Sequence, residues 1–128
     1  MKRPVRAIVY GFLVWWLWFA FVGLSQLLPD TVRAHPSFAT LRLLVLVLLV
    51  VAFAVDYLRR VERSSAAEGL AVGLTWMVLV IANDIGHFLF MEPVDIGQYL
   101  VVSAPLYAFI PVITVTLFGS LVRRAIQA

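Results

Sequence analysis

The chain has 128 residues, enough for about one domain; 63% of them are hydrophobic and only 13% are charged. A typical globular protein is roughly 45–50% apolar and about 25% charged. A water-soluble helical bundle needs a polar face on every helix, and seven acidic plus ten basic residues cannot supply four such faces. The composition therefore excludes an ordinary soluble domain and indicates an integral membrane protein.

The net charge of +3 does not indicate nucleic-acid binding, because the basic residues gather beside apolar segments. Eight of the ten form three clusters, which are Lys2, Arg3 and Arg6; Arg59, Arg60 and Arg63; and Arg123 and Arg124. The cytoplasmic flanks of membrane helices have this composition. The chain has no cysteine, which excludes disulfides, thiol nucleophiles and thiolate metal sites.

Four apolar segments, taken in chain order, predict four transmembrane helices. They run from about residue 7 to 28, 41 to 58, 69 to 91 and 96 to 122. Each meets or approaches the roughly 20 residues that cross about 30 Å of hydrocarbon as a helix. The first apolar stretch, at about 22 residues, exceeds the roughly 7–15 residues of a signal-peptide core, so we interpret it as a span.

Local signals mark where the later helices begin and bend. Two pairs fit capping boxes, Ser65 with Glu68 and Asp95 with Gln98. Pro105 and Pro111 each remove a backbone donor from the fourth segment and predict a kink there. The short connections predict that consecutive helices are antiparallel neighbours.

The distribution of basic residues predicts the orientation. Apart from the three clusters, only Arg33 and Arg42 remain, and they lie at the opposite ends of the spans. The positive-inside rule then places both termini in the cytoplasm. We expect an all-α, four-helix transmembrane bundle of 128 residues in the plasma membrane.

Polar residues inside the apolar segments are the candidate functional residues, because an ionisable group at membrane depth is costly unless it is paired. Asp84 and His87 lie three residues apart on one face of the third segment, and Asn83 lies beside them. A rise of about 1.5 Å per residue places polar groups of the other segments in the same outer half of the membrane. The expected cluster consists of Arg42, Asn83, Asp84, His87, Ser103 and Tyr107.

Two interpretations of this cluster remain open. In the first, Arg42 and Asp84 form a buried ion pair, and the other members of the cluster add hydrogen bonds that fix helix register. In the second, the cluster lines a pocket that opens outward and binds a small solute or passes protons. Trp15 is expected to face lipid or to provide packing bulk.

Other patterns carry less information. His87 and His35 are the only histidines and have no ligand spacing, so we expect neither a metal site nor a cofactor. No catalytic motif is present, and we expect no catalytic residues. Gly69 and Gly73 form a small-xxx-small pair, which predicts close helix packing and is compatible with a homodimer through two third segments.

Three motifs together resemble a functionally uncharacterised family of small, four-span prokaryotic membrane proteins. They are Arg6-Ala7-x-x-Tyr10-Gly11; Glu68-Gly69-x-x-x-Gly73-x-x-Trp76 followed by Asn83 and Asp84; and Tyr107-x-x-Ile110-Pro111-x-Ile113 before Gly119. His87 departs from the pattern, because the aspartate of that family usually lacks a following histidine. The resemblance implies a four-helix bundle and no particular activity.

We therefore expect a non-enzymatic membrane protein with a structural or accessory role. Its partners would be the lipid bilayer and either a second copy or another membrane protein, and not nucleic acid. The alternative is a small oligomeric transporter or channel that uses Asp84 and His87 for a small solute or protons.

Overall fold

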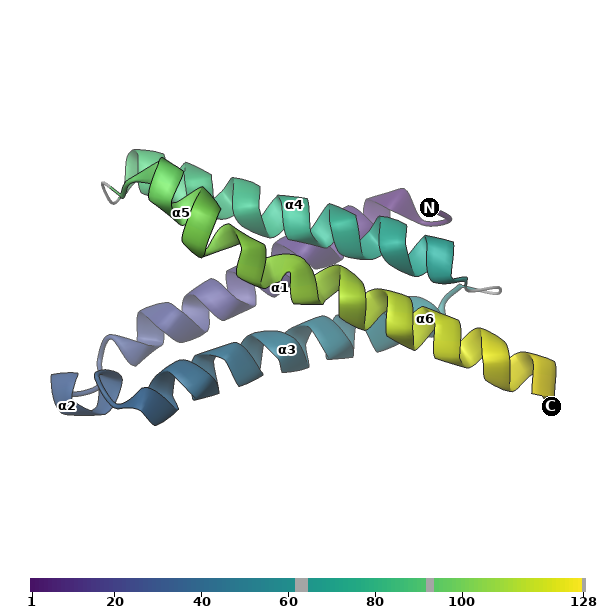
Figure 1. The fold of residues 1–128 in the computed structure, drawn as a ribbon, viewed down its shortest axis with the longest axis horizontal. Coiled ribbons are helices and arrows are strands. Elements are labelled where there is room, and N and C mark those ends of the chain that lie inside the picture. The colour runs from purple at the N-terminus through teal and green to yellow at the C-terminus, as the bar shows by residue number, and fades with distance from the viewer. Residues whose placement is uncertain (62–64, 92–93, 128) are drawn as a thin grey trace.

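The computed structural model describes residues 1–61, 65–91 and 94–127, which form helices and connecting turns without strands (Figure 1). The long helices are α1 (Pro4–Ser25), α3 (Pro36–Arg59), α4 (Ala66–Phe90) and α6 (Phe109–Gln127). The short ones are α2 (Asp30–Arg33), α5 (Ile96–Val102) and the 3-10 helix η1 (Ala104–Ala108). Arg63, a member of one basic cluster, lies outside the described residues, as does the side chain of Arg123.

Side-chain caps fix where the helices begin. The Ser65 hydroxyl accepts a hydrogen bond from the Glu68 N–H at 3.1 Å, which confirms this half of the first predicted capping box. The Glu68 carboxylate binds Tyr57 and the Lys2 N–H instead. The Asp95 carboxylate accepts from the Gln98 N–H at 3.3 Å, which confirms the same half of the second predicted box. Helix α3 is capped by the His35 imidazole, and Pro36 occupies its first turn, where a missing N–H costs nothing.

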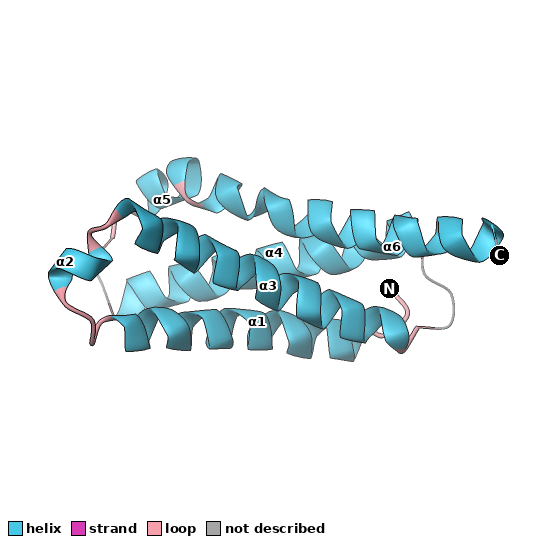
Figure 2. Cartoon of the chain, turned by 90° about the horizontal axis from the view of Figure 1, so that it is seen from below, coloured by secondary structure: helices cyan, strands magenta, loops and turns pink. Residues whose placement is uncertain are grey.

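The four long helices run up and down, and both termini lie at the same end of the bundle (Figures 1 and 2). Helix α4 packs against α1 and α6, and α3 packs against the same two helices. Among the described helices, α3 and α4 are not a closely packed pair, although they follow one another in the sequence. The expectation that consecutive helices are always neighbours is therefore wrong for this pair, which lies on a diagonal.

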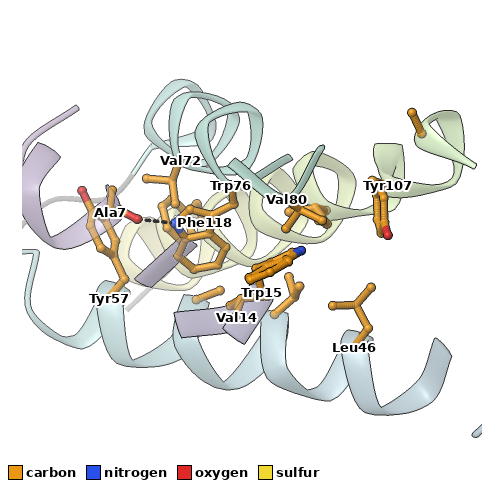
Figure 3. Packing of buried hydrophobic residues seen from close by; sticks show 14 of the residues in the cluster. Ala7, Val14, Trp15, Leu46, Tyr57, Val72, Trp76, Val80, Tyr107 and Phe118 are labelled. Carbon is orange, nitrogen blue, oxygen red and sulfur yellow. Dashed lines mark hydrogen bonds between the residues drawn. The ribbon is translucent and has the colours of Figure 1, made fainter. Parts of the chain in front are cut away.

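The core is a column of apolar side chains between the helices. Trp76 of α4 is fully buried at its centre, and its indole N–H donates to the carbonyl of Ala7 at 2.7 Å (Figure 3). Val14, Val50 and Val80 are also fully buried and bring α1, α3 and α4 into the same core. The indole contact satisfies a polar group that would otherwise be stranded in an apolar interior.

The outer surface is apolar along the length of the helices. Trp16 is 57% exposed, Leu48 58% and Val78 59%, each from a different long helix. Helices α1, α3 and α4 are long and apolar enough to cross a membrane, and α5 with the segment Ala104–Ser120 forms a fourth candidate that is broken. Exposed apolar surface of this extent is unfavourable in water and is expected against lipid.

The fourth segment, predicted as a kinked span over residues 96–122, is a bent pair of helices and not one continuous helix. Helix α5 ends at Val102, η1 follows with Pro105 in its first turn, and the axis bends by 41°. A proline at this place cannot donate a backbone hydrogen bond, and its ring obstructs the preceding turn. The predicted kink is present near Pro105.

Gly69 and Gly73 pack α4 against α6 of the same chain. A Cβ atom added to Gly73 would lie 2.4 Å from Pro111 Cα and 2.2 Å from Thr114 Oγ1. One added to Gly69 would lie 2.6 Å from the Thr114 carbonyl oxygen, and the Thr114 hydroxyl donates to the Gly69 carbonyl at 2.7 Å. The predicted close helix packing at this glycine pair is therefore made within one chain, and α6 occupies this glycine face.

The close approach predicts that Gly73→Ala destabilises the protein by about 1–3 kcal/mol, because the added methyl meets backbone that cannot yield. Gly86→Ala is the matched control in the same helix, since its Cβ would meet nothing within 4 Å. The control should be neutral or up to about 1 kcal/mol more stable, because alanine favours helix. Thermal unfolding in detergent measures both. Equal stability of the two variants would contradict the α4–α6 packing.

Candidate functional site

Asp84 is the buried acid of the predicted third segment, and its side chain is 7% exposed. Its Oδ1 accepts a hydrogen bond from the Trp15 indole N–H at 2.7 Å. Its Oδ2 accepts from the hydroxyls of Tyr99 and Tyr107 at 2.7 and 2.8 Å. We call Trp15, Asp84, Tyr99 and Tyr107 the Asp84 cluster. It joins α4 to α1, α5 and η1.

Local structure brings each donor to the carboxylate. Trp15 is 5% exposed and stacks on Phe19, which lies one turn further along α1, with ring centroids 4.8 Å apart. Figure 3 shows its indole nitrogen directed toward the side of the core where Tyr107 lies. In a straight helix Tyr99 and Tyr107 would be about 12 Å apart along the axis. The break between α5 and η1 accompanies their convergence on one oxygen.

The three hydrogen bonds offset the cost of burying both the carboxylate and its three donors. A carboxylate taken out of water without partners is among the most costly groups to bury. Hydrogen bonds to a carboxylate are stronger than those between neutral groups, and they offset that cost. A buried indole N–H or phenol hydroxyl also needs a partner. Removing Asp84 would therefore leave three donors from three other elements without their acceptor.

Arg42 does not pair with Asp84, so the predicted ion pair is wrong. The guanidinium of Arg42 lies 5.9 Å from the ring centroid of Trp18, and its Nε is buried without a hydrogen-bond partner. The Trp18 indole donates to the Arg42 carbonyl at 3.3 Å. The physical reason is the diagonal placement of α3 and α4, which leaves the carboxylate to donors from α1, α5 and η1.

Asn83 and His87 also make contacts other than those expected. The Asn83 amide donates to the Leu79 carbonyl of its own helix at 2.7 Å. The His87 ring packs edge-on against Phe19 at 4.9 Å. Neither side chain binds Asp84. Over the part of the chain that the structure describes, no group of three or more acidic or histidine side chains could hold a metal ion.

Ser103 and Tyr107 line a pocket of 280 Å³ together with Arg42. We call it the Arg42 pocket. Its remaining lining residues are Trp18, Ala39, Leu43, Leu46, Leu106 and Phe109. Tyr107 belongs both to this pocket and to the Asp84 cluster. Three of the six predicted cluster residues thus share one cavity, and Asp84 is joined to it only through Tyr107.

A second buried carboxylate lies near the opposite end of the bundle. Glu68 is 6% exposed and accepts from the Tyr57 hydroxyl at 2.7 Å and from the backbone N–H of Lys2 at 2.8 Å. Tyr57 stacks on Phe118 of α6, with centroids 5.9 Å apart. The sequence indicated Glu68 only as a capping residue, because its side-chain partners are far away in the chain.

Trp15 and Tyr99 are the site residues that sequence reasoning missed. Trp15 was expected to face lipid or to fill space, but an indole in the middle of an apolar segment needs an acceptor when it is buried. Asp84 is the acid nearest mid-membrane in the predicted spans. The sequence could therefore have predicted a hydrogen bond from the Trp15 indole to the Asp84 carboxylate. Tyr99 has no such signal, because its approach depends on the break after Val102.

Comparisons of the chain with protein-family models, with curated proteins and with solved structures found no match. The resemblance drawn from the three sequence motifs stays a prediction. What the site can do is therefore argued from its geometry: the Asp84 cluster can join helices, and the Arg42 pocket can offer a cation to a small molecule.

Proposed function

We propose that the chain is a non-enzymatic, multi-pass protein of a prokaryotic plasma membrane with a structural or accessory role. The observation that carries this proposal is the occupancy of Asp84, whose two oxygens accept three hydrogen bonds from other helices of the same bundle. An acid that passes protons or binds a solute must exchange partners with water or with that solute. Asp84, at 7% exposure, has both of its carboxylate oxygens bound by donors of its own chain.

The distribution of charge supports the proposed orientation. The end of the bundle that carries both termini also carries Arg3, Arg6, Arg59, Arg60 and Arg124. The opposite end carries Arg33, which pairs with Asp30. An excess of arginine on one side is typical of the cytoplasmic face. Both termini are therefore proposed to lie in the cytoplasm.

Single cysteines test this orientation cleanly, because the chain has none of its own. Thr31→Cys and Ala67→Cys place exposed thiols at opposite ends of the bundle. In intact cells a membrane-impermeant maleimide should label Thr31→Cys and leave Ala67→Cys unlabelled until the membrane is opened. Labelling of Ala67→Cys alone would show the opposite orientation. Labelling of both variants in intact cells would exclude a topology in which the two ends lie on opposite sides of the membrane.

The second candidate function is binding of a small anionic solute in the Arg42 pocket. It is favoured by one observation, the Arg42 Nε that is buried without a hydrogen-bond partner beside a cavity of 280 Å³. A buried guanidinium nitrogen without an acceptor is costly, and an anion in the pocket would supply one. The pocket therefore supports the alternative of a small-solute transporter. In this form of the hypothesis Arg42 binds the solute, whereas the sequence suggested Asp84 and His87.

Benzoate is a suitable probe for this second function, because it joins a carboxylate to an apolar ring. If the pocket binds anions, benzoate should raise the thermal unfolding temperature in detergent above that in chloride of equal ionic strength. Arg42→Gln should abolish the increase, and Arg33→Gln should retain it, because Arg33 lies outside the pocket. An equal response of the two variants would reject a specific site.

A further inference from the structure

A hollow of 630 Å³ opens where the first turns of α1 meet the end of α3. It is lined by Arg3, Pro4, Val5, Arg6, Val9, Tyr10 and Arg60. Neither the Asp84 cluster nor the Arg42 pocket includes any of these residues. The hollow lies at the end of the bundle that carries both termini (Figure 1).

Arginine dominates the polar lining of this hollow. Arg3 and Arg60 are exposed, and Arg6 is half-buried. The charge of Arg60 is partly balanced, because its Nε donates to Asp56 at 3.1 Å and the Tyr10 hydroxyl donates to the same carboxylate oxygen. Three arginines against one aspartate leave a net positive charge at the hollow.

Arg6 supplies the observation that points to a ligand. Its Nη1 is buried and has no hydrogen-bond partner within the described chain. Two acids of neighbouring helices already have partners: Asp56 is bound by Tyr10 and Arg60, and Glu68 by Tyr57 and the Lys2 N–H. A cationic donor left in this state is costly, and an anion in the hollow would balance the charge of the half-buried guanidinium that carries it.

The rest of the lining is apolar, which favours an anion that carries an apolar part over a free inorganic anion. Pro4, Val5 and Val9 form the apolar part of the hollow, and Val5 and Val9 expose 74% and 47% of their surface. A free inorganic anion gains nothing from such surface. A phospholipid has both parts, because its phosphate suits the guanidinium groups and its glycerol and upper acyl chains suit the valines.

We propose that the hollow formed by Arg3, Arg6 and Arg60 binds the phosphate-bearing headgroup of an anionic phospholipid. This inference rests on the proposed membrane function, and in the proposed orientation the hollow faces the cytoplasmic leaflet. Basic pockets between membrane helices on that side are suited to anionic headgroups. The lipid would cross-link the start of α1 and the end of α3 on the surface of the bundle.

The test is lipid binding to the full chain in detergent, measured by native mass spectrometry. The probes are dioctanoyl phosphatidylglycerol, which is anionic, and dioctanoyl phosphatidylcholine, which carries no net charge. The anionic lipid should bind more tightly to the unmodified protein. Arg6→Gln should weaken its affinity about fivefold, the loss expected for one arginine near an anionic headgroup.

Arg59→Gln is the matched control, because it removes the same charge one residue from Arg60 but does not line the hollow. It should leave the affinity for phosphatidylglycerol nearly unchanged. Val9→Trp is the second variant: it keeps every charge and fills the hollow from an exposed position, so it too should weaken lipid binding. This variant keeps the proposal testable if Arg6→Gln does not fold.

Three results would overturn the proposal. Equal affinities for the two lipids would show that the lipid charge does not matter. Equal losses of phosphatidylglycerol affinity in Arg6→Gln and Arg59→Gln would show that the lipid does not bind in the hollow. Competition by inorganic phosphate at the concentration of the lipid would assign the hollow to a free anion. Lipid binding in detergent does not depend on orientation, so an inverted result from cysteine labelling would move the hollow to the other leaflet without abolishing the binding.

Discussion

A carboxylate buried between apolar helices needs hydrogen-bond donors from inside the protein. In this bundle Asp84 accepts three hydrogen bonds, and the placement of the helices around it depends on them. Its donors come from α1, α5 and η1, so one acceptor on α4 is shared by three other elements. Within lipid the association of helices gains little from the hydrophobic effect, because lipid tails are as apolar as leucine. Polar contacts and close packing then carry more of the specificity.

The other features of the fold are consistent with that requirement. The break in the fourth segment accompanies the convergence of Tyr99 and Tyr107 on one oxygen of Asp84. Further along α4, Gly69 and Gly73 let α6 approach closely. Near the opposite end of the bundle, the buried Glu68 carboxylate likewise accepts a hydrogen bond from a tyrosine of another helix, Tyr57. Helix α4 therefore packs closely on α6 at its two glycines and has a buried acid toward each end.

The sequence predicted the helices well and their partners poorly, for physical reasons. Apolar length and helix caps are local properties, so the C-terminal ends of α3 and α4 and the caps at Ser65 and Asp95 could be predicted. Helix α3 begins at Pro36, several residues before the predicted segment. The partner of Asp84 is a long-range property. Equal membrane depth suggested Arg42, but depth does not say which helices are neighbours, and α3 lies diagonal to α4. Gly69 and Gly73 were identified as a packing face for the same local reason, while their partner could not be assigned.

A double-mutant cycle between Asp84→Asn and Tyr107→Phe is the most direct test of the claim that Asp84 holds the bundle together. Tyr107→Phe removes only the hydroxyl, so unfolding free energies in detergent isolate that contact. We predict a coupling of about 0.6–1.7 kcal/mol, the range for polar contacts between membrane helices. The control cycle pairs Asp84→Asn with Tyr57→Phe, whose hydroxyl binds Glu68. It should be additive within about 0.5 kcal/mol. Additive losses in the Tyr107 cycle would contradict the account.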